Sequence, residues 1–163
     1  MKRSLFICMT GFFFAGLCIL YIVKQKKHSE CSTESAQRSL QEDVVAFLQE
    51  YIAIDTSHPN PNYNNAISFL KKNAQADGFE YQELLLPSGR PLFVLCLRGT
   101  DPDLPALLLN HHMNVVPAGD ASLWKVPPFL GLIHEDAVVG RGAQDMKGIA
   151  AVHYTALKAL KKK

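Results

Sequence analysis

ALLLNHHMNVVPAG (106–119) and VVGRGAQDMKG (138–148) are the two stretches of sequence that decide the fold. In each, a short apolar run leads into polar side chains: His112 and Asn114 follow the first run, and Asp145 follows the second, just before a helical pattern. In an open α/β sheet, ligands bind in the crevice beyond the strand ends. The two stretches therefore predict strands whose ends share a candidate binding site.

Helical and strand patterns surround these two stretches. The spacing of Ser39 and Glu42 is that of a capping box and predicts a first helix that ends before DTSHPNPNY. The nearly continuous apolar character of two of the runs is typical of strands covered on both faces by helices. Together the elements predict an α/β fold, a three-layer sandwich with a mixed β-sheet. Apart from the first helix, the predicted elements are a helix over 64–77, strands within 79–86, 92–99 and 106–110, a hairpin of 130–134 with 137–140, and a helix over 146–160.

The N-terminal run LFICMTGFFFAGLCILYIV (5–23) carries no charge over 19 residues. As a helix rising ~1.5 Å per residue it would cover ~28 Å, about the thickness of a bilayer's hydrocarbon core. The run favours an uncleaved signal anchor over a cleaved signal peptide, because it is long and lacks a small-residue cleavage site. We therefore expect a transmembrane helix in residues 1–23, a solvated stalk over 24–38 and a folded domain over 39–163. The expected localisation is a single-pass membrane protein with its folded part lumenal or extracellular.

Composition and charge exclude several classes of protein. Hydrophobic residues make up 48% of the chain and charged residues 20%, which is near the average of packed proteins and argues against wholesale disorder. Five of the 17 Lys and Arg residues lie in residues 1–30, so the remaining chain is slightly acidic. A nucleic-acid partner is therefore not expected. The four cysteines show no CxxC spacing, which argues against a thiolate zinc site.

The residue types at the two predicted strand ends suit a metal. Imidazole nitrogen and carboxylate oxygen are natural ligands for zinc, so His112 and Asp145 could share an ion. Two other interpretations are open at this point. A histidine after a strand is commonly a hydrogen-bonding loop residue, and an aspartate just before a helix is commonly an N-cap.

The sequence from about Ser39 onward resembles the N-terminal part of the dizinc aminoacylase and carboxypeptidase S family of metallopeptidases, and is closest to aminoacylase. The resemblance rests on LLLNHHMNVVP (107–117), Trp124, the pair at 128–129 and GRGAQDMKG (140–148), which occur in the family's order. It implies a zinc-peptidase catalytic domain, two zinc ions as cofactors, and hydrolysis of N-acyl amino acids or small peptides.

Carried over by position, the resemblance implies that His112 is a metal ligand and that Asp145 is the carboxylate that bridges the two zinc ions. Asn114 stands where the family has a catalytic aspartate that orients the ligand histidine, and loss of such a partner typically costs about 10- to 100-fold in metal affinity or activity. The glycines of the second stretch are expected to serve its tight turn. The other histidines match no ligand position: His28, His58, His111, His134 and His153.

The expected function is that of a zinc-dependent amidohydrolase or peptidase acting on a small-molecule N-acyl amino acid or peptide substrate. The family's Glu-Glu pair and its remaining ligands find no match before Lys163, so the chain alone is expected to be a fragment that is inactive and poorly soluble. The alternative is a non-catalytic, membrane-anchored scaffold or binding protein derived from the family. Association with a full-length homologue is a further expectation.

Overall fold

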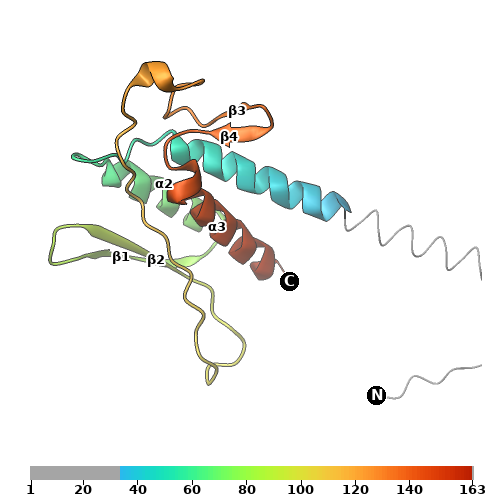
Figure 1. The fold of residues 1–163 in the computed structure, drawn as a ribbon. Coiled ribbons are helices and arrows are strands. Elements are labelled where there is room, and N and C mark those ends of the chain that lie inside the picture. The colour runs from blue at the N-terminus through green and yellow to red at the C-terminus, as the bar shows by residue number, and fades with distance from the viewer. Residues whose placement is uncertain (1–33, 163) are drawn as a thin grey trace, which may run out of the picture. The chain divides into compact units, whose positions relative to one another are not determined.

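Three helices form the framework of the folded part (Figure 1). The computed structural model describes residues 34–162, and the chain divides into two units, Met1–Ser39 and Leu40–Lys163. The first helix covers residues 34–52, so it extends beyond the predicted cap at Ser39, whereas its predicted end is confirmed. The two later helices also confirm the sequence predictions. These helices are α2 (Tyr63–Ala76) and α3 (Gly148–Lys161).

Aromatic side chains hold the three helices together. Phe47 of the first helix stacks on Tyr154 of α3 with ring centroids 4.6 Å apart. Tyr51, one helical turn further on, stacks on Phe69 of α2 at 5.2 Å. Small residues of α2 and α3 are completely or almost completely buried beside these rings, which lets the helices approach closely. The core therefore follows the helical spacing of apolar residues in the sequence.

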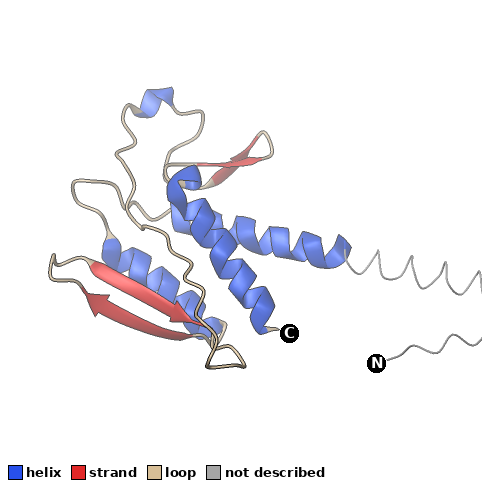
Figure 2. Cartoon of the chain, turned by 60° about the horizontal axis from the view of Figure 1, so that its bottom comes forward, coloured by secondary structure: helices blue, strands red, loops and turns tan. Residues whose placement is uncertain are grey.

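The strands form two separate antiparallel hairpins, which lie on different sides of the helices (Figure 2). In the first hairpin, β1 (Glu80–Leu85) pairs with β2 (Pro91–Cys96) and contacts α2. In the second, β3 (Leu132–His134) pairs with β4 (Ala137–Val139). The two residues of its turn, Glu135 and Asp136, both have positive φ, as a tight two-residue hairpin turn requires. Both hairpins were predicted as strands.

The predicted mixed sheet is wrong for the described residues. Residues 105–114, which include the third predicted strand, are extended but pair with no other strand. The Leu107 and Leu108 side chains are each 84% exposed, and β2 alternates between exposed and half-buried residues instead of being covered on both faces. The physical reason is that a run of apolar residues specifies burial but not a hydrogen-bonding partner, and a strand needs both.

The predicted transmembrane helix also requires correction. Within residues 34–162 there is no helix with the length and apolar character needed to cross a bilayer, and α2 and α3 each have 14 residues. The stretch 5–23, on which the prediction was made, lies outside the described residues. The fold class with a preceding membrane span and the single-pass membrane localisation are both corrected by this finding.

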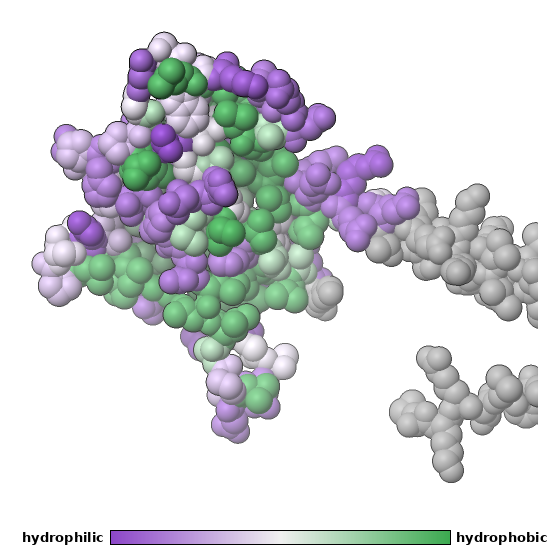
Figure 3. Space-filling view, viewed as in Figure 1, coloured by the Kyte–Doolittle hydropathy of each residue, from purple (hydrophilic) through white to green (hydrophobic). Residues whose placement is uncertain are grey.

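An exposed apolar surface lies beside the first hairpin. Figure 3 shows apolar side chains gathered on the face where this hairpin and the extended segment 105–114 run. Leu85 is 75% exposed and adds to Leu107 and Leu108. Exposed apolar surface beside unpaired backbone favours association between chains.

Charging this surface should raise the solubility of the protein. The double substitution Leu107→Lys and Leu108→Glu should increase the monomer fraction in size-exclusion chromatography, because both side chains are exposed. The thermal midpoint should change by less than about 3 °C, as is usual for surface positions. Ser68→Lys, on the exposed side of α2, is the matched control and should leave the monomer fraction unchanged. An unchanged monomer fraction in the double variant would show that this surface does not drive association.

Candidate functional site

The segment that carries His112 is fixed to the loop that follows the first helix. Thr56 donates a hydrogen bond from Oγ1 to the carbonyl of Met113 at 2.6 Å, and its main-chain carbonyl accepts one from the amide of Val115 at 3.0 Å. The amide of His58 in turn donates to the carbonyl of Val115 at 3.2 Å. These bonds hold residues 113–115 in place although the preceding segment has no strand partner.

The turn that carries Asp145 packs directly on this segment, and glycine makes the contact possible. Gly142 has φ +87°, and a Cβ atom there would lie 2.5 Å from Cγ1 of Val115. A side chain at this position would therefore clash as well as strain the backbone. The Lys147 amide closes the turn by donating to the carbonyl of Gly142 at 2.8 Å. The expected structural role of glycine in this turn is thus explained at Gly142.

Lys147 anchors the same turn to the end of the first helix. Its side chain is completely buried, and Nζ donates to the carbonyls of Tyr51 at 3.0 Å and Ile54 at 2.6 Å. Carbonyls at a helix C-terminus lack helical partners and attract a cation. Burial lowers the pKa of Lys147 to about 8, and the nearby Asp55 carboxylate opposes this shift. Asp145, two residues before Lys147, is held in place by this anchor.

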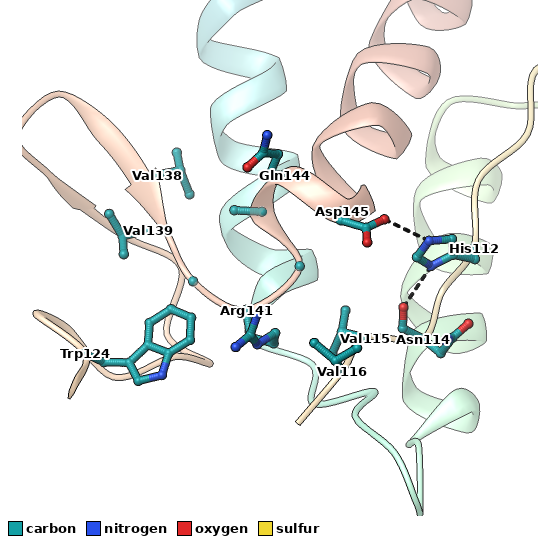
Figure 4. A pocket seen from close by; sticks show the side chains of 13 residues that line it. His112, Asn114, Val115, Val116, Trp124, Val138, Val139, Arg141, Gln144 and Asp145 are labelled. Carbon is teal, nitrogen blue, oxygen red and sulfur yellow. Dashed lines mark hydrogen bonds and ion pairs between the residues drawn. The ribbon is translucent and has the colours of Figure 1, made fainter. Parts of the chain in front are cut away.

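The structure brings His112 and Asp145 together, as Figure 4 shows. His112 Nε2 lies 3.0 Å from Oδ1 of Asp145, and Nδ1 lies 2.9 Å from the main-chain carbonyl oxygen of Asn114. A carbonyl can only accept, so Nδ1 carries the hydrogen, and in its neutral form the ring presents the Nε2 lone pair to the carboxylate. A lone pair and a carboxylate oxygen repel each other at this distance. The pair is therefore stable only with a proton on Nε2 or a cation bound between the two groups.

Among the described residues, the Asn114 side chain has its hydrogen bond with His58 and not with His112. Its amide nitrogen lies 3.3 Å from Nε2 of His58, a residue that the sequence analysis did not associate with the site. In this chain the acceptor for the His112 ring is the Asn114 main-chain carbonyl, which any residue at this position would provide. Asparagine in place of aspartate at position 114 therefore leaves the hydrogen bond that fixes the His112 ring unchanged, because that bond is made by the main chain.

Other histidines stay outside the pair. His111 is partly buried, and burial, with smaller contributions from His153 and His112, lowers its pKa to about 4. His134 lies 3.4 Å from Glu135 in the second hairpin, and His28 is outside the described residues. Within residues 34–162 no three His, Cys, Asp or Glu side chains come together as a metal cluster. The described site therefore offers two candidate ligands.

A pocket of about 530 Å³ opens beside the His112–Asp145 pair. Val115, Val116, Val138 and Val139 give it apolar walls, and Trp124 and Arg141 contribute the remaining large side chains. The indole donates from Nε1 to the carbonyl of Ala118 at 2.9 Å, which fixes the ring in the pocket wall. The site can thus hold a small molecule with an apolar part next to the two candidate ligands.

Comparison with known proteins places the two stretches in a family. Residues 108–163 match peptidase family M20/M25/M40. The chain is 36% identical over 118 residues to Aminoacylase-1 of Mus musculus, which covers 72% of this chain and 29% of that protein. It is 39% identical over 111 residues to Aminoacylase-1 of Dictyostelium discoideum, covering 67% of this chain and 27% of that protein. The chain thus spans less than a third of the length of these relatives.

A solved structure supports the same fold. Human carnosine dipeptidase 1 superposes with a TM-score of 0.56 at 24% sequence identity, over 78% of this chain and 31% of that chain. The arrangement of helices and hairpins described above is therefore an arrangement that a larger protein also contains.

The buried Lys147 should make stability depend on pH. Its pKa is about 8 in the folded state against 10.5 ordinarily, so between these values the unfolded chain binds one more proton than the folded chain. The free energy of unfolding should therefore rise with pH in this window, by about 2 kcal/mol between pH 8 and 9.5. Urea denaturation followed by circular dichroism at several pH values measures the slope. This window lies below the ordinary pKa of tyrosine, whose titration would act in the opposite direction.

Lys147→Met is the matched variant for this measurement, since methionine fills similar space without an ionisable group. Its unfolding free energy should lack the rise seen in the unchanged protein over the same pH range. Lys72→Met, in α2, removes a lysine elsewhere and should keep the rise. If the unfolding free energy rises equally with pH in the Lys147→Met variant and in the unchanged protein, the rise does not come from Lys147.

Proposed function

The chain is an aminoacylase-like member of peptidase family M20/M25/M40, and we propose that its pocket is part of the active site of a zinc-dependent amidohydrolase. The proposed ligands from this chain are His112 and Asp145. The proposed substrate is a small molecule with an amide bond, an N-acyl amino acid or a small peptide. The names of the relatives, two aminoacylases and a dipeptidase of similar fold, support this class.

The observation that carries the proposal is the facing of His112 Nε2 and Asp145 Oδ1 at 3.0 Å. In the neutral tautomer with its hydrogen on Nδ1, His112 directs the Nε2 lone pair at the carboxylate oxygen, and the main-chain bond at Nδ1 fixes the ring in this orientation. A metal-ligating histidine characteristically donates its other ring N–H to a carbonyl or carboxylate. The donor set and its orientation thus fit zinc, which takes imidazole nitrogen and carboxylate oxygen as ligands.

Each described residue has a defined part in the proposed reaction. Zinc, when bound, supplies the Lewis acidity that polarises an amide carbonyl. His112 and Asp145 hold the ion, and the Asn114 carbonyl keeps the imidazole in the tautomer that can ligate. Lys147 keeps Asp145 in position from behind. The valine side chains of the pocket offer an apolar surface for the apolar part of the substrate.

Two ligands are fewer than a catalytic zinc normally has, which is about three plus a water. The described residues by themselves therefore form an incomplete ligand set. We propose that further ligands come from polypeptide outside residues 34–162, in the same protein or in an associated longer homologue. A purely binding, non-catalytic role for the pocket is the rival, and it predicts that added polypeptide brings no hydrolysis.

Zinc binding tests the ligand assignment. The chain should bind Zn²⁺ weakly, and His112→Ala should lower the affinity by about 10-fold or more, because one of two ligands is removed. Asn114→Asp should change the affinity by less than about 10-fold, since the main-chain carbonyl orients the ring. Isothermal titration calorimetry measures both effects. His134→Ala, in the second hairpin away from the pair, is the matched control. Equal losses in the two His→Ala variants would refute the proposed site.

A chimera tests the reaction itself. Residues 40–163 joined to the remainder of mouse Aminoacylase-1 should hydrolyse an N-acetyl amino acid when zinc is supplied, and the unextended chain should not. Hydrolysis should be lost on removal of zinc by a chelator and in the Asp145→Asn variant. A folded, dimer- or monomer-forming chimera that binds zinc but releases no amino acid would favour the binding role instead.

A further inference from the structure

Arg141 is the one lysine or arginine among the residues that line the pocket. Its guanidinium carbon lies 5.0 Å from the centre of the Trp124 ring, so the flat cation is held against the indole. Its main-chain amide donates to the carbonyl of Pro128 at 2.7 Å, which fixes the backbone beneath it. The side chain is therefore positioned by packing and not by an acidic partner.

Most hydrogen-bond donors of this guanidinium find no acceptor within residues 34–162. Nη2 makes a single long contact of 3.5 Å with the carbonyl of Ala118, and this carbonyl already accepts from Trp124. Nε of Arg141 is buried and has no hydrogen-bond partner among the described residues, and Arg141 forms no ion pair with any of them. A guanidinium has five N–H donors, and leaving a buried charged donor unpaired is costly. The side chain is thus suited to an anionic ligand.

The position of Arg141 in the pocket indicates which anion it would bind. Figure 4 shows Arg141 between Trp124 and the His112–Asp145 pair. The only carboxylate that lines the pocket, Asp145, is engaged by His112 and not by Arg141. The buried cation of this region, Lys147, donates to the main-chain carbonyls of Tyr51, in the first helix, and Ile54, two residues beyond its end. Arg141 is therefore the available cation for a negative group of a molecule bound beside the pair.

We propose that Arg141, supported by Trp124, binds the carboxylate of the substrate and makes the pocket selective for N-acyl amino acids over their uncharged amides. The inference deepens the proposed function, since it names the group of the substrate that this chain recognises. A planar carboxylate matches the two parallel N–H donors of a guanidinium edge. Arg141 is thus a specificity-determining residue, separate from the two proposed zinc ligands.

Intrinsic fluorescence tests the proposal without zinc or turnover. Trp124 is the only tryptophan of the chain and lies against Arg141, so a carboxylate bound there should change its emission. The full chain, kept zinc-free with a chelator and at constant ionic strength, is titrated with N-acetylglycine and, separately, with N-acetylglycinamide. N-acetylglycine should give a saturable change, and N-acetylglycinamide should bind at least about 10-fold more weakly, because it lacks the charge.

Variants connect the signal to the guanidinium. Arg141→Gln should weaken N-acetylglycine binding by about 10- to 100-fold, the usual range for a hydrogen-bonded charge. Arg98→Gln is the matched control, because Arg98 pairs with Glu80 outside the pocket, and it should bind as the unchanged chain does. Arg141→Lys keeps the charge but loses the planar arrangement of N–H donors, so it should bind N-acetylglycine more weakly than the unchanged chain. This second variant keeps the test decisive if Arg141→Gln does not fold.

The outcomes separate this inference from the proposed function. Binding that prefers the carboxylate, persists in His112→Ala and is lost in Arg141→Gln supports Arg141 whatever the zinc experiment shows. Failure of zinc binding alone would remove the proposed ligands and leave the carboxylate site standing. Equal binding of N-acetylglycine and N-acetylglycinamide, or undiminished binding in folded Arg141→Lys and Arg141→Gln, would overturn the inference.

Discussion

The buried ammonium of Lys147 is the interaction on which the arrangement of the site depends. Lys147 is shielded from solvent, and its Nζ donates to the carbonyls of Tyr51, in the last turn of the first helix, and Ile54, just beyond it. The same helix carries the aromatic residues that join it to α2 and α3, so the turn with Asp145 is tied to the core of the protein. A cation in this place is costly to bury, which its lowered pKa reflects, but it replaces the helical partners that the terminal carbonyls lack.

The electrostatics of the pocket are divided between its two ends. At one end a histidine lone pair faces the Asp145 carboxylate, and this pair requires a proton or a cation. At the other end the Arg141 guanidinium has no acidic partner among the described residues and is held only by the Trp124 ring and one weak hydrogen bond. The proposed substrate, an N-acyl amino acid, has an amide carbonyl that a cation can polarise and a carboxylate that a guanidinium can bind. The two ends can therefore orient one molecule between them.

The sheet that the sequence predicts is the part of the fold that the described residues do not complete. The leucines at 107 and 108 are strongly apolar but exposed, and the backbone around them has no strand partner. The Aminoacylase-1 proteins of mouse and Dictyostelium are more than three times the length that this chain matches. The apolar pattern of 106–109 is thus what a strand would have if further polypeptide, beyond residues 34–162, packed against it.

The sequence by itself determined the elements whose signals are local. The period of apolar residues located α2 and α3, the two-residue turn at 135–136 located the second hairpin, and the resemblance of GRGAQDMKG identified Asp145 as a candidate ligand. Proximity along the chain is sufficient for such features, because capping, turn and helix preferences act over a few residues.

Only the tertiary structure decided the features that depend on distant segments. The burial of Lys147, the approach of Val115 to Gly142 and the contact of Asn114 with His58 all join residues far apart in the chain. Polar residues such as lysine, asparagine and arginine are usually exposed to solvent, so the sequence alone predicts no partner for them. Their partners are set by the packing of the folded chain. For the same reason the resemblance could associate only the side chain at position 114 with His112, whereas in the folded chain the acceptor within reach of Nδ1 is the Asn114 main-chain carbonyl.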